Sequence, residues 1–107
     1  MPGLRAYGML RNKTMKITFR TFADFREIIG AREQELSLRE GETMGGLLNG
    51  LCNVHPRLQG KLFDASGNIK PYILILKNGR NIESLQHLDT IITADDVISV
   101  FPPVAGG

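Results

Sequence analysis

The stretch DVISVFPPVAGG, residues 96–107, combines an alternating strand with an abrupt exit. Its first part, residues 97–101, alternates between two faces with a period of two, which is typical of a β-strand. Two consecutive prolines then fix φ and remove two backbone donors, so a sheet cannot continue past this point. The stretch therefore predicts a final strand followed by an extended tail, residues 102–107, that leaves the body of the domain.

Two more alternating segments stand near the start of the chain. KITFRTFA (16–23) and QELSLRE (34–40) each alternate apolar and polar side chains, which predicts two strands with one buried face. The segment between them, residues 24–30, breaks the alternation and closes on a glycine, which indicates a loop or a single helical turn. We therefore expect a β-hairpin with a wide connection.

A helix is expected between Thr43 and Pro56. The Thr43 hydroxyl suits the N-cap position, and Leu47, Leu51 and Val54 recur at the spacing of one helical face. Three glycines inside this segment each cost about 1 kcal/mol relative to alanine. We therefore expect a helix that is held by packing, or whose glycines allow close approach to a sheet. These glycines are Gly45, Gly46 and Gly50.

The second half of the chain predicts a hairpin and several turns. PYILILKN (71–78) is an apolar strand, and Asn78-Gly79 tolerates the positive φ of a two-residue turn. A return strand is expected from Ile82, a short irregular or 3₁₀ segment over residues 83–88, and a turn over residues 93–96 before the final strand.

Composition fits one ordinary folded domain. The chain has 107 residues, of which 42% are hydrophobic and 22% charged. Its basic excess comes from the first 14 residues, and the remainder has 10 basic and 11 acidic side chains. A nucleic-acid-binding domain would concentrate cations on its folded surface, so this class is not expected. We expect residues 1–14 to form a flexible extension, residues 15–101 the domain and residues 102–107 the tail.

Several other kinds of protein and site are not indicated. No apolar run approaches the ~18 residues of a membrane span, and the first residues lack the pattern of a secretory signal. The single Cys52 agrees with a reducing compartment, so we expect a cytoplasmic protein. Cys52, His55 and His87 are too few for a four-ligand zinc site, so no metal is expected. Asp95-Asp96 is interpreted as a solvated turn rather than as an acid–base pair.

The expected order of strand, strand, helix, strand, short strand and strand is that of an α+β fold, the β-grasp, in which a mixed sheet packs on one main helix. The chain resembles the ubiquitin-like sulfur carriers, and especially the small subunit of molybdopterin synthase. FADFREIIG (22–30), DVISV (96–100) and above all FPPVAGG (101–107) carry this resemblance, which spans residues 15–107. The glycine-rich helix start and the turn at residues 93–96 depart from the family pattern.

The resemblance implies a function for the tail. An ATP-dependent activating enzyme would adenylate the carboxylate of Gly107, and a sulfur donor enzyme would convert it to a thiocarboxylate. Sulfur would then pass to a pterin precursor of the molybdenum or tungsten cofactor, in complex with the synthase large subunit. ATP-Mg belongs to the activating enzyme, so this chain would bind no cofactor and act as a non-catalytic sulfur-donor subunit.

The tail is also suited to delivery on physical grounds. Six residues extend to at most roughly 20 Å, enough to enter a partner's active site, and glycine adds no side chain at the reacting carbonyl. The tail residues are Pro102, Pro103, Val104, Ala105, Gly106 and Gly107. The resemblance further places Phe22, Arg26 and Phe101 at the partner surface. Core packing of the two rings and a solvated Arg26 are the alternatives.

Two other functions remain open from the sequence. A ubiquitin-like protein modifier would use the same Gly107 carboxylate to form an isopeptide bond with a lysine. A β-grasp interaction domain with an inert tail is the third hypothesis. FPPVAGG favours the sulfur carrier of molybdopterin synthesis over both.

Overall fold

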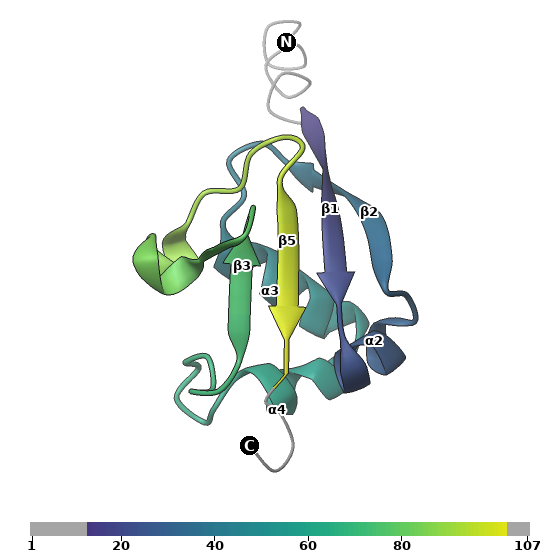
Figure 1. The fold of residues 1–107 in the computed structure, drawn as a ribbon, viewed down its shortest axis with the longest axis vertical. Coiled ribbons are helices and arrows are strands. Elements are labelled where there is room, and N and C mark those ends of the chain that lie inside the picture. The colour runs from purple at the N-terminus through teal and green to yellow at the C-terminus, as the bar shows by residue number, and fades with distance from the viewer. Residues whose placement is uncertain (1–12, 103–107) are drawn as a thin grey trace, which may run out of the picture.

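The computed structural model describes residues 13–102 (Figure 1). This part of the chain contains five strands, three α-helices and three short 3₁₀ turns. The strands are β1 (Thr14–Thr21), β2 (Glu33–Arg39), β3 (Leu74–Lys77), β4 (Arg80–Asn81) and β5 (Val97–Phe101). The helices are α2 (Ala23–Ile29), α3 (Met44–Val54) and α4 (Gln59–Leu62). Three 3₁₀ turns cover Pro56–Leu58, Ile82–Ser84 and His87–Asp89.

The sheet is mixed and has the order β2-β1-β5-β3-β4. The first strand pairs with the last in parallel, with Thr21 opposite Val100, and every other neighbouring pair is antiparallel. The helix α3 crosses one face of this sheet (Figure 1), and none of the helices within residues 13–102 covers the opposite face in that view. This arrangement is the predicted β-grasp, with β1 and β5 at its centre.

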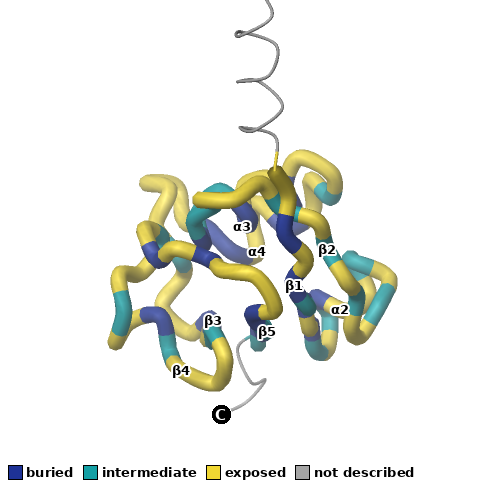
Figure 2. The backbone as a smooth tube through the Cα atoms, turned by 90° about the horizontal axis from the view of Figure 1, so that it is seen from above, coloured by how far each residue is buried: buried dark blue, intermediate teal, exposed yellow. Residues whose placement is uncertain are grey.

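The core lies between the sheet and α3 (Figure 2). Alternate residues of β1 are buried, as the period-two pattern predicted, and Ile98 and Val100 of β5 face the same side. Leu47, Leu48 and Leu51 on α3 are buried against them. The prediction for Val54 is wrong, since it is 71% exposed. The helix ends there, and the turn that follows uses Leu58 to cover the core instead.

The start of α3 confirms the Thr43 cap and explains one glycine. The Gly46 amide donates to the Thr43 hydroxyl at 3.1 Å. A Cβ on Gly45 would stand 3.2 Å from the side chain and the carbonyl of Leu88. The close approach therefore occurs, but it is to the turn that carries Leu88 and not to the sheet.

The helices α2 and α4 differ from the expectation of one helix. The segment 24–30 was expected to be a loop or one turn, yet α2 continues for 7 residues. It buries Phe25, at 1% exposure, and ends at Gly30 with φ 92°, the left-handed conformation that glycine adopts without strain. One buried side chain per short helix carries too weak a periodicity to be seen in the sequence; α4 likewise buries Leu62.

The turn before β5 is a polar cluster rather than the expected solvated loop. Asp96 is 4% exposed, and its carboxylate accepts from the Thr93 amide at 2.7 Å and the Asn78 side chain at 2.8 Å. Lys77 lies 3.3 Å from it. Burial raises the pKa of Asp96, but the hydrogen bonds from Thr93, Asn78 and Lys77 together outweigh this and lower the pKa below its usual value. Asp96 therefore anchors the start of β5, while Asp95 is exposed.

The β3–β4 hairpin confirms the Asn78-Gly79 turn, since both residues have positive φ, 52° and 81°. β3 is shorter than predicted and begins only at Leu74. The prediction that the return strand begins at Ile82 is wrong: β4 covers Arg80–Asn81, and Ile82 turns inward in a 3₁₀ segment and is 3% exposed. The pairing of β3 with β4 ends there because the Ile82 side chain packs into the hydrophobic core.

The first strand begins before residue 15, where the domain was expected to start. Thr14 already belongs to β1, and the Lys13 carbonyl accepts from the Glu40 amide at 3.1 Å, so both residues are part of the sheet rather than of an extension. Residues 1–12 and the tail residues 103–107 lie outside the described residues. Among residues 13–102, no helix is long and apolar enough to cross a membrane.

Candidate functional site

The point where β5 ends is marked by two stacked aromatic rings. The parallel register sets Thr21 opposite Val100, so the next residues, Phe22 and Phe101, are neighbours. Their ring centroids lie 4.2 Å apart and their planes differ by 8°. Ile98 and Val100 face the core, so Phe101 lies on the other, outer face of the sheet.

The stack of Phe22 and Phe101 can be compared with the two alternatives for these rings, a place at the partner surface and packing in the core. Both side chains are half-buried, and neither belongs to the core cluster. Each ring therefore covers one face of the other and leaves the remainder available at the surface. The structure places the two predicted partner residues together, at the last described residues before the tail.

Arg26 lies on α2, which begins directly after Phe22. Phe22 is the N-cap of this helix, so Arg26 follows it by four residues and falls on the same side. The Arg26 side chain is exposed, and no ion pair involves it within residues 13–102. The arginine is therefore a free surface cation one helical turn from the stacked rings.

Sequence analysis missed a third apolar residue at this place. Leu74 stands opposite Phe101 in the β3–β5 register and is 38% exposed. The alternation of Leu74 with the buried Ile73 and Ile75 was the available signal, but a run of apolar residues hides which side faces outward. We call Phe22, Leu74 and Phe101 the outer patch. Tyr72, 78% exposed, lies two residues before Leu74 in the sequence.

A groove lies on the other side of the tail exit. It has a volume of about 440 Å³ and is lined by Asp24, Phe25, Gly60, Lys61, Lys70 and Pro102. Lys61 donates to the Asp24 carboxylate at 2.8 Å, and the Lys70 side chain is exposed. Pro102, the first tail residue, is thus half-buried between the outer patch and a groove with excess positive charge.

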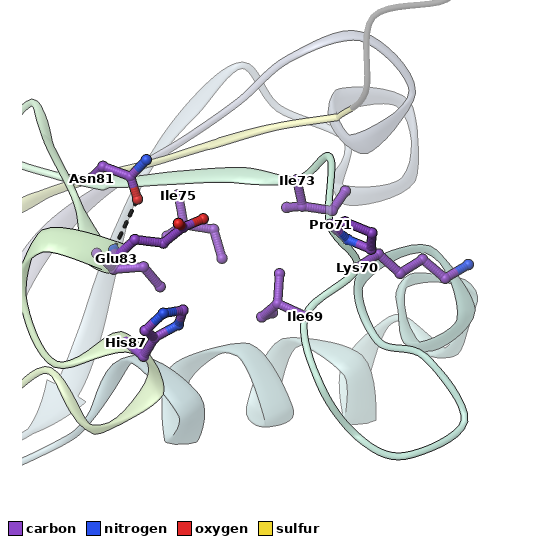
Figure 3. Close-up of a pocket in the computed structure, with 9 residues that line it drawn as sticks. Ile69, Lys70, Pro71, Ile73, Ile75, Asn81, Glu83 and His87 are labelled. Atoms are coloured by element: carbon purple, nitrogen blue, oxygen red, sulfur yellow. Dashed lines mark hydrogen bonds between the residues drawn. The ribbon is translucent and has the colours of Figure 1, made fainter.

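A second hollow lies between β3 and the 3₁₀ turns (Figure 3). It is lined by isoleucines, with Glu83 and His87 at its side, and the Glu83 amide donates to Asn81 at 2.9 Å. Its volume is about 60 Å³, well below the 300–1,000 Å³ of typical ligand pockets. This hollow is therefore too small for a nucleotide or a pterin.

Within residues 13–102, Cys52 and the potential metal ligands were the remaining candidates for reactive groups. Cys52 is buried in α3, and burial raises the pKa of its thiol above the usual value, which disfavours the reactive thiolate. No cluster of three or more potential metal ligands occurs in the described part of the chain. Within the described residues, the end of β5 lies beside the outer patch.

The fold and this surface define a ubiquitin-like β-grasp domain. The sequence matches the model of the ThiS family over residues 19–107, so the chain belongs to this family. It is a member of the group of ubiquitin-like sulfur carriers and small archaeal modifiers, whose curated relatives include a putative sulfur carrier protein from Archaeoglobus fulgidus.

Individual relatives resemble the chain over nearly their whole length. Small archaeal modifier protein 3 from Haloferax volcanii is 38% identical over 93 residues, which are 87% of this chain and 100% of the relative. The crystal structure of SAMP1 from the same organism has a TM-score of 0.74 at 30% identity and covers 86% of this chain and 99% of its own. A putative molybdopterin converting factor subunit 1 from Pyrococcus furiosus has a TM-score of 0.67 at 29% identity, covering 84% and 99%.

Proposed function

We propose that this chain is the small subunit of molybdopterin synthase and carries sulfur on the carboxylate of Gly107. The observation that carries the proposal is the exit of β5. This central strand ends at the stacked Phe22 and Phe101, and Pro102 leaves the sheet beside them. The likeness to a molybdopterin converting factor subunit supports the assignment.

The family match supports a working role for the end of the chain. It extends to residue 107 and so includes both final glycines. The six residues from Pro102 reach at most roughly 20 Å when extended. That length lets the carboxylate enter the active site of a partner while the outer patch contacts the surface around it.

The proposed activation of Gly107 has two chemical steps. The Gly107 carboxylate attacks the α-phosphorus of ATP, forming an acyl adenylate and releasing pyrophosphate on the activating enzyme. Sulfide-level sulfur from a donor enzyme then attacks the acyl carbon, breaks its bond to the phosphate oxygen and releases AMP. The product is a thiocarboxylate, which the synthase large subunit would use to add sulfur to a pterin precursor.

The first experiment tests this activation directly. The full chain is incubated with a matched activating enzyme, ATP-Mg and a sulfur source, and its mass is measured. We expect an increase equal to the difference between a sulfur and an oxygen atom, located by fragmentation at Gly107. Deleting Gly107 moves the reacting carbon by about 3.5 Å, and an error of ~1 Å already costs about 10²-fold in rate, so the product should disappear.

Matched controls distinguish the effect of a displaced carboxylate from the effect of a folding defect. Adding one glycine after Gly107 shifts the carboxylate by the same distance in the other direction, and it should abolish the product as well. Both variants should unfold at the midpoint of the wild type, because they leave the described domain unchanged. Normal thiocarboxylate formation and normal pterin sulfuration by the shortened chain would refute the proposal.

A protein modifier is the second candidate. The name of the 38% identical relative, small archaeal modifier protein 3, favours it. In this case the activated Gly107 carbonyl would be attacked by a lysine amine, forming an isopeptide bond and again releasing AMP. Conjugates in which fragmentation places the Gly107 carbonyl on the ε-amine of a target lysine, with no sulfur transferred to a pterin by any large subunit, would select this function.

A further inference from the structure

The strand β2 forms an edge of the sheet that the proposed carrier function does not use (Figure 1). In its hairpin with β1, the hydrogen-bonded pairs include Lys13 with Glu40 and Thr21 with Arg32. The alternation of an antiparallel ladder then directs the backbone N–H and C=O groups of Glu33, Glu35 and Ser37 away from β1. Within residues 13–102, β2 pairs with β1 alone, so these groups are available for another strand.

The charges along β2 are complementary to those of a second copy of β2 that runs antiparallel to it. The outer face of β2 carries Glu33 and Glu35 near its start and Arg39 at its end, all exposed. Within the chain, the two glutamates also pair with Arg20 and Lys16 of β1. If a second copy of β2 runs antiparallel with Leu36 opposite Leu36, then Glu33 of each chain stands opposite Arg39 of the other. Opposite charges in directly facing positions stabilise a strand pair. The two-fold symmetry forms this pair twice.

An apolar groove lies beneath the same edge, between β2 and α3. It has a volume of about 170 Å³, and its lining includes Leu36, Leu38 and Gly50. Nothing lies within 4 Å of the position that a Cβ would take on Gly50, so the helix backbone is bare there. A hollow of that size takes one benzene-sized apolar group. On an added strand, the leucines that alternate with the charged residues would point to this side of the sheet.

We propose that β2 is a self-association edge, at which two copies of this chain pair antiparallel with Leu36 at the two-fold axis. The backbone groups of the edge supply the ladder, the Glu33 and Arg39 charges set the register, and the grooves receive apolar side chains of the opposite copy. Each copy contributes one edge strand of 7 residues, so we expect a weak dimer that depends on concentration. The outer patch lies on β3, β5 and Phe22, so both tail exits remain free.

A charge swap tests the register. The single variants Glu33→Arg and Arg39→Glu each convert two attractive pairs into repulsive ones, and each should weaken dimerisation about tenfold. The double variant restores opposite charges and should return the dissociation constant to within about threefold of the wild type. Sedimentation equilibrium over a wide range of concentrations measures these constants, with the unfolding midpoint of each variant recorded alongside.

Controls distinguish pairing at the β2 edge from a general effect of net charge and from another segment that covers this edge. Glu27→Arg changes the net charge as Glu33→Arg does, but on α2, and should leave the dissociation constant unchanged. A wild type that stays monomeric at millimolar concentration overturns the proposal. Rescue by the Glu35→Arg/Arg39→Glu pair instead of the Glu33 pair overturns the register. Dimers that form only after deletion of residues 1–12 would show that this segment covers the edge, and they would also overturn it.

Discussion

The stacked rings at the tail exit yield a quantitative prediction about stability. Replacing Phe22 or Phe101 by leucine keeps an apolar side chain of similar reach but removes one partner of the stack. A double-mutant cycle of Phe22→Leu, Phe101→Leu and the pair then isolates the energy of ring contact from the loss of apolar area.

The magnitude follows from the geometry. A centroid distance of 4.2 Å with planes 8° apart is a close stack, and such pairs contribute about 0.5–1.5 kcal/mol beyond their buried area. Both rings are half-exposed, so we expect a coupling of about 0.5–1 kcal/mol. Urea unfolding followed by circular dichroism measures it, because a slope of about 1–2 kcal/mol per molar converts this energy into a midpoint shift of about 0.3–1 M.

A control cycle and a binding assay complete the test. Phe22→Leu combined with Tyr72→Leu should show no coupling, since no stack involves the exposed Tyr72 among residues 13–102. A coupling between Phe22 and Phe101 below about 0.3 kcal/mol, the error of additivity, would refute the reasoning. From the proposed function we also expect Phe101→Leu to weaken binding to a synthase large subunit, and unchanged affinity would remove Phe101 from the proposed partner surface.

Three further predictions concern the domain that positions the tail. Asp96→Asn removes a buried charge that accepts several hydrogen bonds, so the free energy of unfolding at pH 7 should fall by about 2 kcal/mol. The pKa of Asp96 is lowered in the folded state, so its contribution to stability is present above the unfolded pKa of about 4 and is lost as the pH falls through the folded pKa. The free energies of unfolding of the wild type and of Asp96→Asn should therefore converge in acid. A difference that stays constant with pH would contradict this. Gly50→Ala should stabilise the monomer by up to about 1 kcal/mol, because the added Cβ lies in open space. Gly45→Ala should stabilise it less or destabilise it, because the added Cβ contacts Leu88. Thermal melts at low protein concentration compare the two variants, and equal gains in stability would be inconsistent with the Leu88 contact. Thr43→Ala should cost about 1 kcal/mol in urea unfolding, and no change would show that the hydroxyl is not a functional cap.

Local features of this protein follow from the sequence alone. The alternation over residues 97–101 predicts β5, Thr43 predicts the start of α3, and Asn78-Gly79 predicts the tight hairpin. Each depends on the conformational preference of one residue or on a periodicity within a few residues. Such preferences act within the segment itself, so they can be recognised without knowing what the segment packs against.

Other features were decided only by the tertiary structure. Phe22 and Phe101 are far apart in the sequence, and only the parallel pairing of β1 with β5 brings their rings together. Asp96 belongs to a turn by its local sequence, yet Thr93, Asn78 and Lys77 converge on it and make its burial favourable. The exposure of Leu74 was hidden because an apolar run does not indicate which of its faces meets the core. These outcomes depend on partners that distant segments supply, and the free energy of such contacts is defined only once the sheet has formed.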